Sequence, residues 1–199
     1  MRAGYSLVAV ALVLVGCAPE APSSDPSALP TETTPTPTET VPATVTFTMP
    51  SECAQILPES RTGPWLSDDI ILLGGPDGKY GDEYLADPSP EQQLGGITCI
   101  WGPSDSENSS VTVSVAPLSA ADRKDVVTDL VVTQGLNEEA FDGATIYWQH
   151  GDTELEPAIL NVLRADSWIS VIVTVGGDDS YADAEDIADE VFALVYRAA

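Results

Sequence analysis

A short apolar run near the N-terminus limits what the rest of the chain can be. Arg2 supplies a small positive charge, and Leu7 to Val15 form an apolar stretch of about nine residues. A helix needs about 20 apolar residues to cross a bilayer, so this run is too short for a permanent span and is typical of a secretory signal. The residues that follow are therefore expected to fold outside the cytoplasm, where disulfides form and persist.

The apolar run ends at Leu14-Val15-Gly16-Cys17. This ending resembles the lipobox of bacterial lipoproteins, in which a small residue precedes an invariant cysteine. The resemblance implies a signal peptide over residues 1–16, cleavage before Cys17, and a diacylglyceryl group with acyl chains such as palmitate on the Cys17 thiol. Two acyl chains hold a protein on a bilayer, so we expect a lipid anchor on the extracytoplasmic face of the cell membrane. The alternative is an ordinary secretory signal followed by a cysteine that is there by chance.

Residues 17–44 are rich in proline and threonine. Such a segment buries too little apolar surface to offset the entropy of ordering, and its prolines favour extended polyproline-II geometry. About 25 residues at ~3.1 Å each reach roughly 75 Å. We expect a disordered tether that lifts the following domain off the membrane. A passive disordered leader predicts almost the same behaviour, and the composition also permits O-glycosylation.

The chain has three cysteines, Cys17, Cys53 and Cys99. Lipidation of Cys17 leaves an even pair in an exported chain, which predicts a Cys53–Cys99 disulfide. This bridge would close a loop of about 47 residues and contribute about 4 kcal/mol in the chain-entropy model. A metal site is disfavoured because two distant thiols lack further ligands at a suitable spacing. A redox-active pair is disfavoured because the sequence has no Cys-x-x-Cys.

Residues 45–199 predict one extracytoplasmic domain of the α+β class. A short helix is expected around Cys53, ended by Pro58, and longer helices are expected from Ser119 to Gly135 and from Ser180 onward. Residues 60–95 predict a long ordered loop with one short strand or helical turn. Strands are expected near residues 45–49, 96–102, 111–115, 144–149, 157–164 and 168–175. The expected fold is a single antiparallel sheet of about five to six strands, with helices packed mainly on one face and one disulfide.

The strand near residues 111–115 shows the alternation most clearly. Its valines at 111, 113 and 115 alternate with Thr112 and Ser114. This pattern, shared with the strand that carries Cys99, predicts a half-buried antiparallel pair with one face on the core.

The charge of the chain excludes some classes of partner. It has 7 Lys+Arg against 32 Asp+Glu, which gives a formal net charge of −25. Nucleic-acid binding and adhesion to anionic lipid both need a basic surface, so neither is expected. Membrane contact is expected only through the lipid anchor.

The residues that could perform chemistry do not form a catalytic pattern. His150 is the single histidine, no Gly-x-Ser-x-Gly is present, and a zinc site built on several histidines is excluded by the count. Carboxylate pairs such as 68/69, 138/139, 154/156 and 178/179 are expected by chance in so acidic a chain. The acidic loop 77–83 suits Ca²⁺ in its oxygen ligands but lacks the Asp-x-Asp-x-Asp-Gly spacing and contains Lys79. We therefore predict no catalytic residues, no metal and no cofactor.

Trp65 is the best candidate for an exposed aromatic contact, because it lies in the irregular region between Pro64 and Leu66. Burial of this side chain in the core is the favoured alternative. Trp101 and Trp168 lie in predicted strands and are expected in the core.

Two further motifs accompany the lipobox and the tether: Cys53 in Ser-Glu-Cys-Ala-Gln-Ile-Leu-Pro, and Cys99-Ile100-Trp101 on a strand. Together they resemble the small actinobacterial cell-envelope lipoproteins of uncharacterised function, whose domains look like the extracellular sensor domains of some receptor kinases. The resemblance implies a disulfide-stapled extracytoplasmic domain over residues 50–199. It implies no established activity and no catalytic residues.

The expected function is a membrane-anchored, non-enzymatic binding or sensor-like domain. Its partner would be a peptide, another envelope protein or a small ligand. One alternative is a cell-wall or glycan hydrolase that uses paired carboxylates about 5–10 Å apart. The other is a calcium-dependent binding module.

Overall fold

The computed structural model describes residues 45–198 except 85, 106–108 and 153–154. The predicted signal peptide, the lipidation site Cys17 and the whole tether over residues 17–44 lie outside these residues, and so does Glu154. They stay predictions. Within the described ranges, no helix combines the length and the apolar character that crossing a membrane requires.

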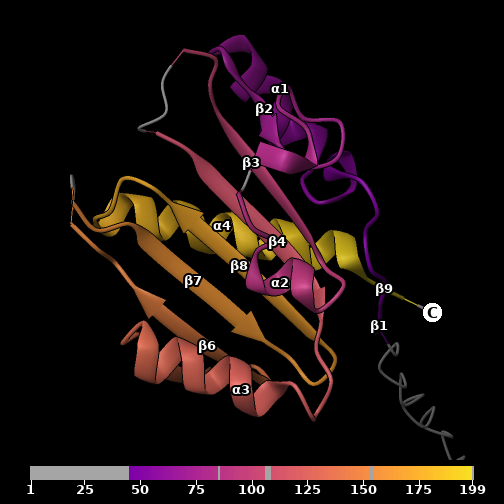
Figure 1. Ribbon diagram of the computed structural model, residues 1–199, viewed down its shortest axis with the longest axis vertical. Coiled ribbons are helices and arrows are strands. Elements are labelled where there is room, and N and C mark those ends of the chain that lie inside the picture. The colour runs from indigo at the N-terminus through magenta and orange to yellow at the C-terminus, as the bar shows by residue number, and fades with distance from the viewer. Residues whose placement is uncertain (1–44, 85, 106–108, 153–154, 199) are drawn as a thin grey trace, which may run out of the picture. The chain divides into compact units, whose positions relative to one another are not determined.

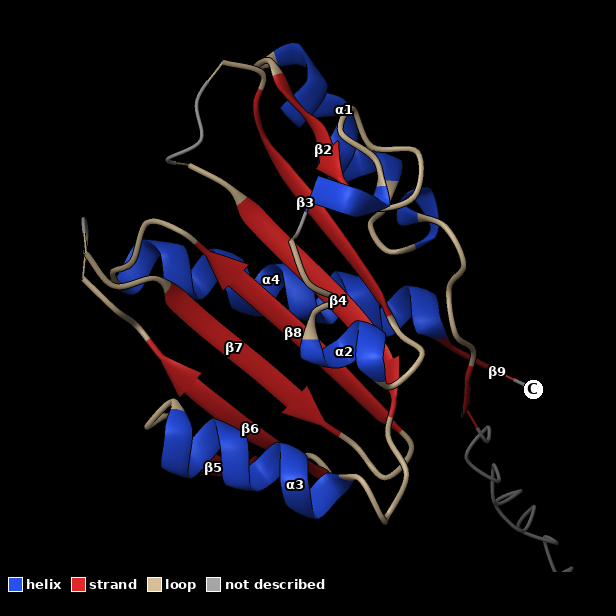
Figure 2. Ribbon diagram, in the orientation of Figure 1, coloured by secondary structure: helices blue, strands red, loops and turns tan. Residues whose placement is uncertain are grey.

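A sheet of seven strands forms the centre of the described domain (Figures 1 and 2). Its strand order is β2-β3-β4-β8-β7-β6-β5, and every neighbouring pair is antiparallel. The strands are β2 (Ile70–Gly74), β3 (Ile97–Pro103), β4 (Val111–Pro117), β5 (Asn137–Phe141), β6 (Ala144–Gln149), β7 (Ala158–Leu163) and β8 (Ser167–Val173).

The helices are short except for the last. They are η1 (Cys53–Gln55), α1 (Glu59–Ser67), η2 (Asp82–Tyr84), α2 (Pro90–Gln93), α3 (Arg123–Thr128), the π-helical turn η3 (Asp129–Thr133) and α4 (Asp178–Val195). A separate two-stranded ribbon pairs β1 (Val45–Phe47) with β9 (Tyr196–Ala198).

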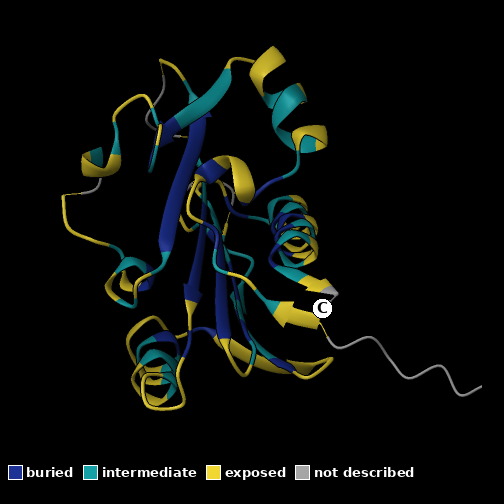
Figure 3. Ribbon diagram, turned by 90° about the vertical axis from the view of Figure 1, so that its right-hand side faces the viewer, coloured by how far each residue is buried: buried dark blue, intermediate teal, exposed yellow. Residues whose placement is uncertain are grey.

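Both faces of the sheet are covered by helices, as the side view shows (Figure 3). On one face, α4 places its apolar stripe on residues of β3, β4, β7 and β8. The buried stripe of α4 consists of Ala184, Ile187, Ala188, Val191 and Val195. On the other face, Leu130 of η3 packs with Tyr147, Leu163 and Trp168, and Leu94 beside α2 packs against the same cluster.

The antiparallel sheet, the helices and the single disulfide agree with the α+β expectation, but two details were wrong. The sheet has seven strands rather than five to six, because β2, the short strand or helical turn allowed for within residues 60–95, joins it and β5 was not expected. All five residues of β5 are exposed, so the strand has no apolar alternation. The strand expected near residues 45–49 is β1, which pairs with β9 outside this sheet. Helices lie on both faces, with the longest helix, α4, on one and the shorter α2 and α3 on the other.

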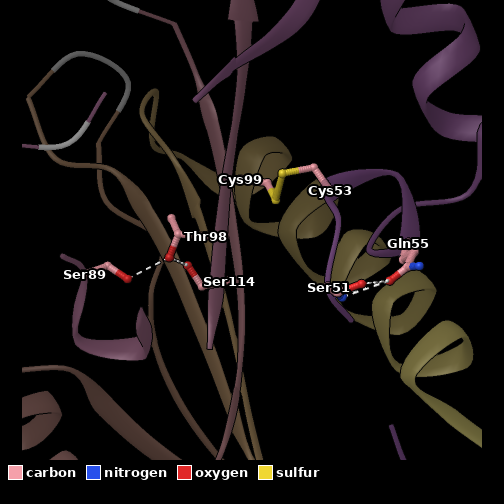
Figure 4. The surroundings of a disulfide bond; sticks show 7 residues. All are labelled: Ser51, Cys53, Gln55, Ser89, Thr98, Cys99 and Ser114. Atoms are coloured by element: carbon pink, nitrogen blue, oxygen red, sulfur yellow. Dashed lines mark hydrogen bonds between the residues drawn. A yellow bond between two sulfur atoms is a disulfide. The ribbon is translucent and has the colours of Figure 1, made fainter. Parts of the chain in front are cut away.

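The predicted disulfide is confirmed. Cys53 of η1 and Cys99 of β3 are bonded, with 5.7 Å between their Cα atoms, and both are buried (Figure 4). Gly75 lies against this bond with a φ of +102°, and a Cβ there would stand 2.8 Å from the Cys53 Sγ. Only glycine suits that position, because it combines a left-handed backbone with a close approach.

The helix boundaries follow the sequence signals in part. Pro58 ends the turn that carries Cys53, as expected, but it also serves as the N-cap of α1, which was not expected. The Ser119 hydroxyl bonds the Asp122 carboxylate just before α3, and Gly135, with a φ of +74°, follows η3. The C-terminal helix begins at Asp178, two residues before the expected Ser180.

Candidate functional site

A row of polar side chains crosses the sheet on the face covered by α2 and α3. Four of its members are paired in register on neighbouring strands: Thr98 with Ser114, Ser114 with Ser170, and Ser170 with Asn161. All four are buried. We call these four residues the polar row. Hydrogen-bonding groups placed side by side in an interior have to satisfy one another or a ligand.

Hydrogen bonds connect the polar row to its surroundings. The Thr98 hydroxyl lies 2.9 Å from the Ser114 hydroxyl and 2.6 Å from the Ser89 hydroxyl, as Figure 4 shows. Asn161 accepts a 2.9 Å bond from the indole N–H of Trp168 through its Oδ1 atom. The same view shows the disulfide on the other side of β3, because the consecutive residues Thr98 and Cys99 point to opposite faces.

The short helix α2 covers the Thr98 end of the polar row. Ser89 caps this helix, since its hydroxyl accepts from the Gln92 N–H and the Gln92 side chain accepts from the Ser89 N–H. Gly96 then brings the chain close to the sheet: a Cβ at this position would lie 2.4 Å from the Val115 carbonyl oxygen and 2.6 Å from that of Glu91. The sequence therefore fixes α2 tightly against β4 through a capping box and one glycine.

Glu91 of α2 carries an acidic group into this interior. The residue is only 6% exposed, although exposed Glu is the norm. Its carboxyl is hydrogen-bonded by its own backbone N–H and by the side chains of Ser89 and Ser170. Burial raises the pKa of Glu91 above its ordinary value, and these hydrogen bonds only partly oppose that effect. No salt bridge in the described part of the chain includes Glu91.

These groups line a cavity of about 350 Å³ between the sheet, α2 and η3, which we call the polar cavity. Its polar lining consists of the polar row, Glu91, Ser89, Thr112 and Gln134, and Asp87, which is exposed, contributes a second carboxylate. Its apolar walls are Trp168, Leu130, Ile159 and Ile172. The lining residues include no Lys, Arg, His or Cys among those described. A hollow with apolar walls and a few convergent polar groups is the usual form of a small-molecule site.

A second hollow, of about 560 Å³, lies on the opposite face between α4 and strands β5 to β7. Its floor includes Ile146, Leu160 and Val162, and its lining includes the carboxylates of Glu139, Asp142, Glu185, Asp186 and Asp189. Burial, together with the charges of Glu185 and Glu139, raises the pKa of Tyr181 in this groove to about 12. Exposed carboxylates occur all over this acidic domain, so those in the groove do not mark it as a binding site. The polar cavity is the better candidate, because its Glu91 is buried.

The two side chains singled out by sequence lie elsewhere. Trp65 is partly buried, with its ring 6.0 Å from that of Trp101 and the Arg61 guanidinium 5.7 Å from its centroid. It is therefore largely a packing residue on the α4 side. The His150 ring stacks on Tyr181 at 4.2 Å, and its Nδ1 lies 2.6 Å from the Asp178 carboxylate. Neither residue lines the polar cavity.

The acidic residues considered from sequence do not gather into a metal site. Asp68 and Asp69 are exposed after α1, Glu138 and Glu139 are exposed neighbours on β5, and Asp178 and Asp179 lie in the first turn of α4. Within the described ranges, no group of three or more His, Cys, Asp or Glu side chains is placed to hold a metal ion. The loop 77–83 therefore offers no such group to the calcium alternative.

Comparison of this chain with protein-family models, with curated proteins and with solved structures finds no match. The function of the polar cavity has to be inferred from its own residues. Glu91 and the polar row were not predicted from sequence, although signals for both exist. Ser89-Pro90-Glu91-Gln92 is a capping box with proline at the first helical position. Thr98, Ser114 and Ser170 are polar residues within strands made mostly of apolar residues.

Proposed function

We propose that this protein is a membrane-anchored extracytoplasmic binding domain that takes a small organic ligand into the polar cavity without transforming it. The observation that carries the proposal is the set of buried polar residues around one hollow: Glu91, Thr98, Ser114, Asn161 and Ser170. Six polar or charged residues are buried in the described part of the chain, and five of them line this cavity. Burying polar groups costs free energy, so their concentration at one hollow favours a recognition role over chance.

A binding role fits the chemistry of the lining better than catalysis does. The described lining has no thiol or imidazole to act as a nucleophile or a proton shuttle. Its hydroxyls are held in a chain of hydrogen bonds from Ser89 to Thr98 to Ser114. Fixed donors and acceptors beside an apolar wall orient a ligand, which is what a receptor or sensor domain requires.

Benzyl alcohol should bind in the polar cavity with a dissociation constant of roughly 10 mM, the value expected for a ligand of this size. Binding is measured on the full chain by the shift of the Trp168 indole N–H signal in nuclear magnetic resonance. The Trp168→Phe variant assigns that signal. Because Trp168 both lines the cavity and donates to Asn161, its N–H should report occupancy directly.

Thr112→Phe places a bulky ring in the cavity, since Thr112 lines it and is only partly buried, and should abolish the shift. Thr46→Phe is the matched control, because Thr46 is exposed on β1 and lies away from the cavity lining. A Trp168 signal that benzyl alcohol moves equally in Thr112→Phe and in the wild type would contradict the proposed function.

The proposed anchor has its own test at Cys17. Mass spectrometry of the mature N-terminal peptide should find a diacylglyceryl group on Cys17, and the protein should fractionate with membranes. Cys17→Ser removes the thiol that accepts the lipid, so this variant should be unmodified and released from the membrane. An unmodified Cys17 in membrane-associated wild-type protein would exclude a lipid anchor at this residue.

A further inference from the structure

The polar cavity has an electrostatic property that narrows the class of its ligand. Glu91 is buried to 6% exposure, and none of the described salt bridges includes it. The described lining contains two carboxyls, Glu91 and Asp87, and no cationic side chain. A buried carboxyl is ordinarily paired with a cation in the protein, and here that partner is absent from the cavity lining.

We infer that the ligand is a small organic ammonium compound whose charged nitrogen lies against the Glu91 carboxylate. This inference rests on the proposed function, because it names the ligand class of the same cavity. The ammonium N–H groups would donate to Glu91 and to neighbouring hydroxyls such as Ser170. The hydrocarbon part would lie against Trp168, whose ring also suits a nearby cation.

Folding buries the Glu91 carboxyl before any ligand arrives. When two charges meet in a protein interior, the free-energy cost of removing both ions from water usually offsets much of their Coulomb attraction. Burial also raises the pKa of the Glu91 carboxyl, and an ammonium group beside it would favour the ionised form and supply the opposite charge that the described lining lacks. A charge-assisted hydrogen bond is also stronger than a neutral one. An amine should therefore be favoured over an alcohol of the same shape.

The size of the cavity and the position of the acid agree with this ligand class. About 350 Å³ accommodates a molecule of amino-acid size but not a peptide or a glycan chain. Ser89 and Ser170 hold the Glu91 carboxyl by hydrogen bonds, so it is oriented before the ligand arrives. Preorganisation of this kind reduces the entropy cost of binding.

The test compares three probes of nearly equal shape on the full chain: benzylammonium, benzyl alcohol and benzoate. Their affinities are read from the Trp168 indole N–H shift at neutral pH. Benzylammonium should bind about tenfold more tightly than benzyl alcohol, because its hydrogen bonds to Glu91 are charge-assisted. Benzoate should bind most weakly, because it would bring a negative charge beside Glu91.

Glu91→Gln keeps the shape of the side chain and removes its charge, so it should bring benzylammonium and benzyl alcohol to the same affinity. Two matched variants locate the effect. Asp87→Asn neutralises the exposed carboxylate of the cavity, and Glu83→Gln neutralises an exposed carboxylate outside the lining. Both should leave most of the tenfold preference in place.

The results that would overturn the ammonium inference differ from the result that would overturn the proposed binding function. Equal binding of benzylammonium and benzyl alcohol to the wild type would overturn the ammonium inference and leave the proposed binding function intact. A preference that disappears in Asp87→Asn but persists in Glu91→Gln would also overturn it, because the exposed carboxylate would then be responsible. If none of the three probes moves the Trp168 signal, the proposed function itself fails. The wild-type comparison decides the matter even if Glu91→Gln does not fold.

Discussion

Replacing Cys53 and Cys99 together by alanine should lower the free energy of unfolding by about 4 kcal/mol. The two cysteines are separated by 46 positions, so the disulfide removes much of the conformational freedom of the unfolded chain. Both residues belong to the α4-side core, and the bond joins η1 to a strand of the sheet. The measurement is urea denaturation followed by tryptophan fluorescence under non-reducing conditions.

A Cys17→Ser background in both proteins keeps the third thiol from exchanging with the pair, and it should itself leave the stability unchanged. Reduction of this background protein should reproduce most of the loss seen in the double variant. A loss below about 1 kcal/mol in the double variant would show that the bond contributes little beyond its packing, contrary to the loop-entropy argument.

Ile187→Ala should destabilise the domain by about 3 kcal/mol, within the range found for truncating a large buried aliphatic side chain. Ile187 is fully buried in the middle of α4 and belongs to the core cluster that joins this helix to β3, β4, β7 and β8. The substitution removes apolar contacts and leaves a cavity between the helix and the sheet. Chemical denaturation of the full chain measures the difference.

Asp186→Ala is the matched control, because Asp186 is the preceding residue on the same helix and is exposed. Its effect should stay within about 0.5 kcal/mol. Similar losses in the two variants would mean that helix propensity rather than burial governs α4, and the assignment of Ile187 to the core would be wrong.

The sequence predicted the parts of the fold in which one face of an element is apolar and the pattern repeats. Strands β3, β4 and β8 alternate clearly, and α4 carries a regular apolar stripe. Strand β5 was missed for the opposite reason, since all of its residues are exposed and it is held only by pairing with β6. Backbone pairing of this kind leaves little trace in the hydrophobic pattern.

The candidate site could not be predicted from the sequence for a different reason. Ser114 alternates with valines, which suggests a strand with one face in water. Ser114 is nevertheless buried, because it lies on the sheet face that α2 and α3 cover. Periodicity separates the two faces of a strand but does not reveal what covers the polar face. Recognition of the cavity required the register that aligns Thr98, Ser114, Ser170 and Asn161, and register depends on long-range pairing.

The ribbon of β1 and β9 has a mechanical consequence for a domain held from its N-terminal side. A pull that enters at Val45 loads the three residue pairs of this ribbon first and separates the ring of Phe47 from that of Tyr196, now 5.6 Å apart. The yielding stops at Cys53, because the sulfur–sulfur bond passes the tension directly to β3. The segment from Val45 to Cys53 can thus extend under load before the tension reaches the seven-stranded sheet.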